Sequence, residues 1–214
     1  MAINLFTQYY LDRNMIRHHE LFYCLTKNTA NNFKKVIVLV ENDIVKELVE
    51  KYFPICKSIN IGKRASFNDF FAIMGNDEYA NDINIMSNSD IFFDDLDIIK
   101  GYLANSPKNT CLALSRYDYH SETNIVPFLR ADSQDTWIFN GNPKIHTELE
   151  YGMGFGGCDN RLAHDIQSHG YNVINPSHTI KTYHLHNSNV RNYLNEKNEP
   201  IERIPQPYLL VNPI

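Results

Sequence analysis

The sequence predicts an α/β protein with a mostly parallel central sheet that is flanked by helices. Strand-like and helix-like stretches alternate over the first 115 residues with short connections, which favours parallel strands covered by helices. The run Val36–Val40 is apolar throughout, as expected for a central strand that is buried on both faces. After residue 115 the alternation stops, and we expect the second half of the chain to complete a site over the sheet.

Short apolar runs between polar turns mark the expected strands. These strands are Asn4–Tyr10, Val36–Val40, Ile55–Ile61, Ile83–Met86, Thr110–Leu114, Thr136–Phe139 and Ile180–His184. In sheets of this kind, ligands bind beyond the carboxyl ends of the parallel strands. The segments expected at these ends are Thr7 to Tyr9, Gly62 to Arg64 and Asn88 to Asp90.

Periodicity and end signals predict the helices. After the first strand, five residues recur at alternating steps of four and three positions, which indicates one face of a first helix. They are Leu11, Met15, His18, Phe22 and Leu25. Asn42 or Asp43 can cap a second helix. Ser66 and Asp69 resemble a capping box for a third helix, which Gly75 would end. Two further helices are expected over Asp95–Leu103 and Asn160–His169.

The length of 214 residues suits one domain of ordinary size, which we expect to span residues 1–198 in two halves, 1–115 and 116–198. Residues 199–214 contain four prolines and are expected to form a wrapping tail or a linker to a further domain. With a net charge of −5, the sequence gives no sign of a basic face, and we expect no nucleic-acid partner. We expect no membrane span, because the apolar runs fall far short of the roughly 20 residues that a span needs. We also expect a cytoplasmic location.

The four cysteines, Cys24, Cys56, Cys111 and Cys158, are widely spaced, and no pair forms a CxxC motif. This spacing favours buried free thiols in a reducing compartment over a disulfide framework or a zinc site.

Asp90 is the first candidate for chemistry. It ends the polar cluster Ser87-Asn88-Ser89-Asp90, which follows an expected strand. One carboxylate and neighbouring neutral oxygen atoms at the ligand-binding edge of a sheet suit Mg²⁺ or Mn²⁺ with a diphosphate. The alternative is that Ser89 or Asp90 only caps the turn after the strand.

Asp159 is the second candidate, because it follows the glycine-rich segment Gly152–Gly157 and begins an expected helix. Glycines allow a bulky ligand to approach the backbone closely, and the carboxylate could then act as a general base or as a hydrogen-bond anchor. The alternative is that Asp159 is an N-cap and that the glycines only form a turn.

His184 and His186 share one face of the last expected strand, so both imidazoles can point to one place and complete a metal site. The alternative is that they are ordinary surface or core histidines. Arg191, Lys63 or Arg64 could neutralise a departing diphosphate, or could be surface charges without a ligand.

Asp135 and Trp137 alternate onto one face of another expected strand. An indole ring beside a carboxylate is typical of sugar binding, in which the ring stacks on a pyranose and the carboxylate accepts hydroxyl protons. The alternative is a half-buried strand with Trp137 in the core.

From Asn4 to about Tyr193, these segments together resemble the GT-A glycosyltransferases. Asn88-Ser89-Asp90 is similar to a degenerate DxD metal motif, in which Asn88 replaces the first acid and removes one charge. The segment from Gly154 to Asn160 resembles the glycine-rich segment before the catalytic acidic pair, with Cys158 in place of the first acid. The chain also resembles the N-terminal glycosyltransferase domain of multidomain chlorovirus proteins that help to build capsid glycans.

The resemblance implies a metal-dependent enzyme that moves a sugar from a UDP-sugar, such as UDP-glucose or UDP-rhamnose, to a hydroxyl of an acceptor glycan. Residues 1–115 would bind the nucleotide, and residues 116–198 would bind the acceptor. The implied metal ligands for Mn²⁺ or Mg²⁺ are Asp90 and His186 or His184. The implied donor contacts are Thr7, Gln8, Tyr9, Arg64, Asn88, Ser89 and Arg191. Asp159 would be the base of an inverting reaction, whereas in a retaining reaction Asp159 or Asp135 would position a substrate.

Two other functions fit parts of the pattern. A nucleotidyltransferase would favour a glycine-rich phosphate loop near the first strand, and residues 5–20 contain no glycine. A non-catalytic carbohydrate-binding domain would use Trp137 and the tyrosines.

Overall fold

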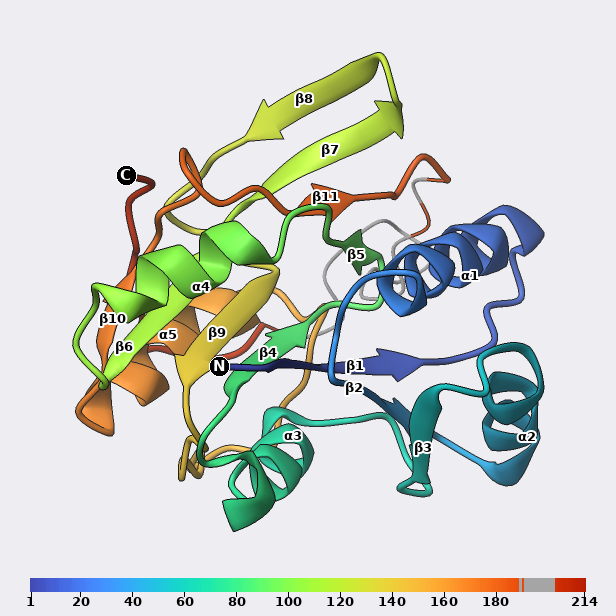
Figure 1. The fold of residues 1–214 in the computed structure, drawn as a ribbon, viewed down its shortest axis with the longest axis horizontal. Coiled ribbons are helices and arrows are strands. Elements are labelled where there is room, and N and C mark those ends of the chain that lie inside the picture. Colours follow the sequence, from blue (N-terminus) through green and yellow to red (C-terminus); the bar gives the residue numbers. More distant parts are fainter. Residues whose placement is uncertain (189, 191–202) are drawn as a thin grey trace.

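A computed structural model describes residues 1–188, 190 and 203–214 (Figure 1). Within these residues, seven strands form the main sheet in the order β10-β6-β9-β4-β1-β2-β3. They are β1 (Ile3–Tyr9), β2 (Lys35–Val40), β3 (Cys56–Asn60), β4 (Ile83–Ser87), β6 (Thr110–Leu114), β9 (Thr136–Asn140) and β10 (Asn172–Ile174). A second sheet has the order β5-β11-β7-β8. Its strands are β5 (Ile91–Phe92), β7 (Arg116–Ser121), β8 (Asn124–Phe128) and β11 (Tyr183–His184).

The main sheet is parallel except for β9, which pairs antiparallel with β4 and with β6. The mostly parallel sheet is therefore confirmed. Because β9 runs against its neighbours, its first residue, Thr136, lies at the edge where their carboxyl ends lie, opposite Ser87 of β4. The segments before β9 and after β4 thus meet at the ligand-binding edge predicted from the sequence.

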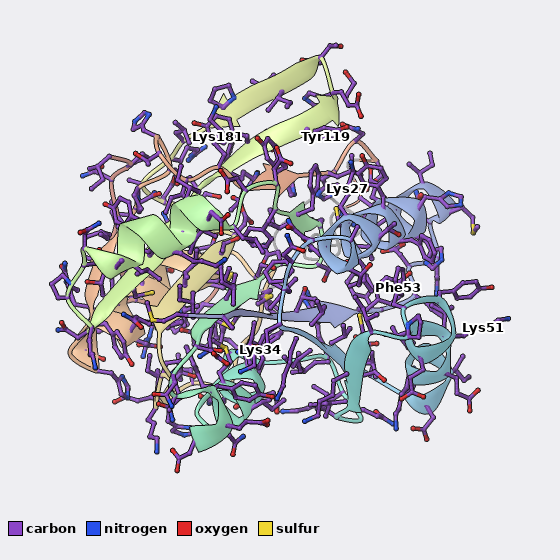
Figure 2. The ribbon with its side chains drawn as sticks, viewed as in Figure 1. Lys27, Lys34, Lys51, Phe53, Tyr119 and Lys181 are labelled. Atoms are coloured by element: carbon purple, nitrogen blue, oxygen red, sulfur yellow. The ribbon has the colours of Figure 1, made fainter. Side chains whose placement is uncertain are left out.

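Helices cover both faces of the main sheet. They are α1 (Met15–Thr29), α2 (Asp43–Tyr52), α3 (Phe67–Met74), α4 (Asp97–Ala104) and α5 (Cys158–Ser168), with a short 3-10 helix over Asp77–Tyr79. One apolar cluster joins α1, α2 and α4 to the sheet, and another joins α3 and α5 to it. Phe53, labelled in Figure 2, packs between Phe22 of α1 and Tyr9 of β1 in the first cluster.

The predicted helix ends are largely confirmed. Asn42, rather than Asp43, caps α2 by accepting from the backbone N–H of Val45. Ser66 and Asp69 form the reciprocal capping box at the start of α3, and Gly75 is its C-cap residue. These signals depend only on residues within one turn of the helix, which explains why they can be read locally.

The predicted face of α1 is confirmed at Phe22 and Leu25, which pack in the core, and is wrong at its start. Leu11 precedes the helix with 44% of its surface exposed, and Met15 is 64% exposed. The buried residues of α1 are Arg17, Glu20, Leu21, Cys24, Leu25 and Asn28. Charged residues can be buried here because Arg17 pairs with Glu20 and with the distant Asp90.

The second sheet also differs from the prediction. The last strand is only Tyr183–His184; before it, the Thr182 hydroxyl donates to the carbonyl of Ser115 and Ile180 packs into the core. The hairpin of β7 and β8, which projects at the top of Figure 1, has no counterpart among the expected strands. Its second strand is mostly exposed although most of its residues are apolar, and it contains Pro127, which disfavours a strand in a sequence-based prediction.

Residues 203–214 lie against the rest of the described chain. Their backbone N–H groups donate to distant carbonyls, from Ile204 to Gly156, from Leu209 to Asn160 and from Val211 to Ala131. Ile204 and Val211 are buried in the core. This segment therefore wraps around the domain.

The four cysteines are buried and free, as predicted. Among the helices that the structure describes, none combines the length and the apolar character that a bilayer span requires.

Trp137 belongs to the core and does not form a sugar-binding surface. It is fully buried, and its ring contacts Phe67 edge to face at 5.4 Å between centroids. Because β9 is a central strand, both of its faces are covered, and alternation along the strand cannot produce an exposed ring.

We predict that Trp137→Ala lowers the free energy of unfolding by about 3–5 kcal/mol, because it leaves a large cavity in a packed core. Urea denaturation followed by circular dichroism measures this change. Ile44→Ala, at a side chain that is 72% exposed, should change the same quantity by no more than about 0.5 kcal/mol. A Trp137→Ala protein of unchanged stability would contradict the core assignment.

Candidate functional site

A cleft of about 590 Å³ lies at the carboxyl edge of the main sheet, between it and the second sheet. Opposite charges face each other across it. The positive or imidazole side chains are those of Arg17, Arg64, Arg116, Arg130, His120, His184 and His186. The acidic side chains are those of Asp90, Asp118, Asp132, Asp135 and Asp159.

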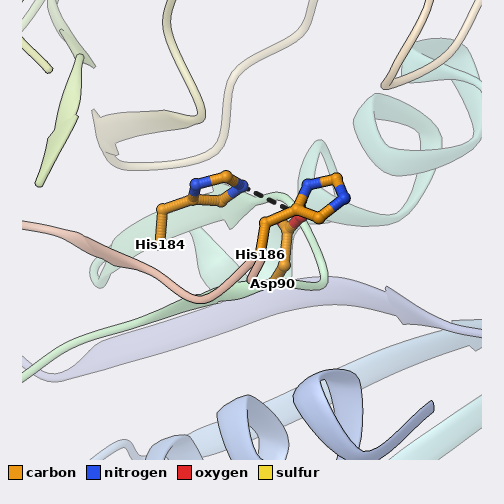
Figure 3. Close-up of side chains that lie close together, drawn as sticks. All are labelled: Asp90, His184 and His186. Atoms are coloured by element: carbon orange, nitrogen blue, oxygen red, sulfur yellow. Dashed lines mark hydrogen bonds and ion pairs between the residues drawn. The ribbon is translucent and has the colours of Figure 1, made fainter. Parts of the chain in front are cut away.

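Strand pairing brings Asp90 to His184 and His186. Ile91 of β5 lies opposite His184 of β11, and the backbone N–H of Leu185 donates to the carbonyl of Asp90. His184 Nε2 lies 3.2 Å and His186 Nδ1 3.8 Å from Asp90 Oδ2. Figure 3 shows the His184 ring directed toward the carboxylate and the His186 side chain in front of Asp90. Three residues that the sequence predicted to meet thus lie together, although 94 positions separate Asp90 from His184.

The His184 ring is positively charged at neutral pH. Its Nδ1 lies 2.9 Å from Asp118 Oδ1, so each ring nitrogen donates to a carboxylate. Burial opposes the charge, but the charge of Asp90 and the hydrogen bond to Asp118 outweigh it and raise the pKa of His184 to about 9.

The His186 ring is neutral at the same pH, because burial and the nearby Arg17 lower its pKa. Its Nε2 lies 2.7 Å from the carbonyl oxygen of Val190 and must carry the proton, since a carbonyl only accepts. The Nδ1 lone pair is consequently left facing Asp90, as a metal ligand requires.

The donor set fits a divalent transition metal. One ligand atom each from Asp90, His184 and His186 lies within 4.8 Å of the others, a separation that one ion can bridge. Burial alone would raise the pKa of Asp90, but His184 and Arg17 outweigh it and hold the pKa well below its ordinary value, so the carboxylate is ionised. Imidazole with carboxylate suits Mn²⁺ better than Mg²⁺, which prefers oxygen ligands. His184 would have to lose a proton to join such a set.

Arg17 is a site residue that the apolar periodicity missed. Its Nη2 lies 2.5 Å from Asp90 Oδ2, and its Nη1 contacts Glu20 and the carbonyl of Leu185. A usable signal was present, because Arg17 stands four and eight positions before Leu21 and Leu25 on the buried face of α1.

Asp135 and Asp159 form an acidic pair at the other end of the site. Asp135 precedes β9 and accepts hydrogen bonds from Asn88 Nδ2 and Arg116 Nη1, both at 2.7 Å. Asp159 is not the N-cap of α5; Gly157 holds that position with φ 80°, and Asp159 lies in the first turn. Burial, and then the charge of Asp135, raise the pKa of Asp159 to about 8.

Arg116 and Asp118 connect these two groups, and neither was predicted from the sequence. Arg116 Nε lies 3.0 Å from Asp118 Oδ1, while its Nη1 lies 2.7 Å from Asp135 Oδ2. They alternate on one face of β7 with His120, which also lines the cleft. This polar alternation was the available signal.

The predicted nucleotide contacts divide into two groups. Gln8, Arg64, Asn88 and Ser89 line a smaller pocket that shares Arg17 and Asp90 with the cleft. Arg64 also donates to the carbonyl of Met153 at 2.7 Å. Arg191 lies outside the described residues.

Thr7 and Tyr9 do not line either of these pockets, which corrects the prediction for both. Thr7 is buried and its hydroxyl donates to the carbonyl of Ser87, while Tyr9 packs against Phe53. Tyr10 lines the cleft instead. Lys63 is half exposed and pairs with Glu150 and Asp69.

No family model matches the sequence, and no curated protein matches it. Among solved structures, the mannosyltransferase PcManGT from Pyrobaculum calidifontis, in complex with GDP-Man and Mn²⁺, has a TM-score of 0.51 at 11% identity, over 90% of this chain and 58% of that one. S. aureus TarS 1-349 has a TM-score of 0.48 at 13% identity, over 86% and 60%. A 4-diphosphocytidyl-2C-methyl-D-erythritol synthase has a TM-score of 0.46 at 10% identity, over 94% and 93%.

The chain spans less than two thirds of the length of the first two structures. At this identity the likeness to PcManGT concerns the fold. Together with the seven-stranded mixed sheet and its helices on both faces, it confirms the predicted fold class. The chain has the GT-A, or nucleotide-diphospho-sugar transferase, fold.

Proposed function

We propose that the chain is a metal-dependent glycosyltransferase that moves a sugar from a nucleoside diphosphate to an acceptor hydroxyl. The observation that carries the proposal is one cleft that holds both groups such a reaction needs. Asp90, His184 and His186 converge at one end of it, and the pair Asp135 and Asp159 lies at the other. The cleft stands at the carboxyl edge of the sheet, where ligands of open α/β sheets bind.

The metal would be held by Asp90 and His186, with His184 as a third ligand after it loses its proton. When bound, it would stabilise the negative charge that develops on the departing diphosphate. Gln8, Arg64, Asn88 and Ser89 would contact the nucleotide from the smaller pocket that they line. Arg17 and Arg64 are the described arginines shared by that pocket and the cleft, so we assign them to the phosphates.

Asp159 is proposed as the general base of an inverting transfer. The acceptor oxygen would bond to the anomeric carbon while the bond from that carbon to the diphosphate oxygen breaks, and its electron pair leaves with the diphosphate. The acceptor proton would move to the ionised form of Asp159, which the raised pKa of about 8 makes a stronger base than an ordinary aspartate and which becomes the main form only as pH passes 8. Asp135 would position the acceptor while it remains bound to Arg116. A product of retained anomeric configuration would limit Asp159 to positioning.

For the donor we propose a UDP-sugar, with UDP-glucose and UDP-rhamnose as the first to test, and for the acceptor a glycan, such as a viral capsid glycan made in the host cytoplasm. These details rest on the sequence resemblance. GDP-mannose belongs in the same hydrolysis screen, because PcManGT was solved with it. Release of pyrophosphate from a nucleoside triphosphate, rather than of a nucleoside diphosphate from a nucleotide sugar, would identify a nucleotidyltransferase. A carbohydrate-binding domain loses its main support because Trp137 is buried.

We predict that wild-type protein binds UDP at least about tenfold more tightly with Mn²⁺ than without it, and that Asp90→Asn abolishes this difference. The substitution keeps the shape of the side chain but removes the charge that a cation needs. Isothermal titration calorimetry with and without Mn²⁺ measures both proteins, with GDP as a second nucleotide. Full metal enhancement in Asp90→Asn would contradict the assignment of the metal site.

For Asp159→Asn we expect turnover to fall by at least about 100-fold, because an amide cannot accept the proton. Donor affinity should change little, since the substitution leaves the donor side of the cleft unaltered. Steady-state kinetics and calorimetry separate the two effects. The matched control is Asp97→Asn on the surface of α4, where the side chain of the exposed aspartate pairs only with Lys100 among the contacts described. Unchanged turnover in Asp159→Asn would remove its role as base.

The raised pKa of Asp159 also predicts how stability depends on pH. Between the ordinary pKa of 3.8 and the folded value of about 8, the unfolded chain loses this proton and the folded chain keeps it. The side chain therefore lowers wild-type stability progressively as pH rises through this interval. The unfolding free energy of Asp159→Asn minus that of wild type should increase from pH 4 to pH 8 by more than about 1.4 kcal/mol, the equivalent of one pKa unit. Urea denaturation at each pH tests this, and a constant difference would contradict it.

A further inference from the structure

Arg17 approaches the same oxygen of Asp90 as the two imidazoles. Its Nη2 lies 2.5 Å from Asp90 Oδ2, and that oxygen also faces His184 Nε2 at 3.2 Å and His186 Nδ1 at 3.8 Å. A divalent cation bound to this oxygen at about 2.1 Å would lie within about 5 Å of the Arg17 Nη2 atom. The guanidinium would thus stand next to the ion.

Two positive charges so close together repel each other strongly in this place. Arg17 is only 6% exposed, so little water is available to screen its charge. The single negative charge of the Asp90 carboxylate also cannot fully neutralise two cations, and Arg17 already forms an ion pair with it. Metal binding and the contact between Arg17 and Asp90 are therefore opposed.

Arg17 has other contacts that can hold it if it leaves Asp90. Its Nη1 lies 3.2 Å from Glu20 Oε2 and 3.3 Å from the carbonyl of Leu185. Glu20 is fixed in turn by the backbone N–H and the hydroxyl of Ser188, both at 2.7 Å. Arg17 also lines both the cleft and the smaller pocket, so it already borders the space that a ligand there would occupy.

We propose that Arg17 and the divalent cation compete for Asp90, and that the diphosphate of the donor relieves the competition by taking Arg17 as its own counter-charge. This inference rests on the proposed function. Arginine binds phosphate oxygens through two parallel N–H groups, which suits this exchange of partners. The cation and the nucleotide then bind cooperatively, because each removes an obstacle to the other.

The experiment is a Mn²⁺ titration followed by electron paramagnetic resonance, in which bound Mn²⁺ loses the signal of the free ion. Wild-type protein and Arg17→Met are compared without nucleotide and with saturating UDP or GDP. We expect Arg17→Met to bind Mn²⁺ alone at least about tenfold more tightly than wild type. The enhancement of Mn²⁺ binding by the nucleotide should fall several-fold in the variant, because part of the coupling is lost.

Two controls separate competition at Asp90 from a general change in charge. Arg64→Met removes another cation of the same cleft, one that donates to the carbonyl of Met153, and should change the affinity for Mn²⁺ alone by less than about threefold. Arg17→Met combined with Asp90→Asn should lose the tight Mn²⁺ site. Arg17→Met leaves Glu20 without its charged partner, so thermal unfolding is recorded alongside. The pair Arg17→Met with Glu20→Gln removes both charges and carries the same expectation if the single variant does not fold.

Each outcome has one meaning. If wild type shows coupling between nucleotide and Mn²⁺ but a folded Arg17 variant binds Mn²⁺ alone no more tightly, the competition is disproved and the proposed function stands. If wild type does not bind Mn²⁺ even with UDP or GDP, the proposed metal site fails, and the role of Arg17 fails with it.

Discussion

The site depends on the ionised Asp90 carboxylate in a buried position. Burial favours the neutral acid, and only the positive charges of Arg17 and His184 keep this group charged. The three residues come from α1, from the turn between β4 and β5, and from β11. Removal of one partner from a buried ion pair typically costs about 3–5 kcal/mol, whereas apolar replacements of the whole group are often neutral. Such a cluster therefore adds little to stability and is better understood as part of a site.

A continuous set of ion pairs extends from Asp90 through the cleft. Asp90 contacts His184, which contacts Asp118, and Asp118 contacts Arg116. Arg116 then contacts Asp135, which binds Asn88, two positions before Asp90. The ring of contacts closes on the turn where it begins. It holds the second sheet against the main sheet and gives each end of the cleft a fixed position relative to the other.

The framework could be predicted because its signals are local or periodic. The capping box of Ser66 and Asp69 lies within one helical turn, and the apolar run of β2 directly reports burial on both faces. Two simple rules placed Asp90 at the carboxyl end of its strand and His184 and His186 on one face of another strand. The resemblance to the GT-A glycosyltransferases then implied that Asp90 meets one of these histidines.

Other parts depended on tertiary contacts that no local pattern contains. Apolar periodicity misplaced the start of the buried face of α1, because Arg17 and Glu20 are buried by partners elsewhere in the chain. Alternation paired Trp137 with Asp135, but Asp135 precedes the strand and Trp137 lies inside a central one. The hairpin that supplies Arg116 and Asp118 was missed because β8 is mostly exposed and contains Pro127.

The segment 203–214 has a mechanical consequence for the helix that carries Asp159. Leu209 is bonded to Asn160 in the first turn of α5, and a Cβ atom at Gly157 would lie only 2.8 Å from the hydroxyl of Tyr208. Residues 203–214 thus pack against the first turn of α5 and support it. A polypeptide cut at residue 198 would lose this support and expose the apolar surface that Ile204 and Val211 cover, so the position of the carboxylate and the solubility of the fragment would suffer together.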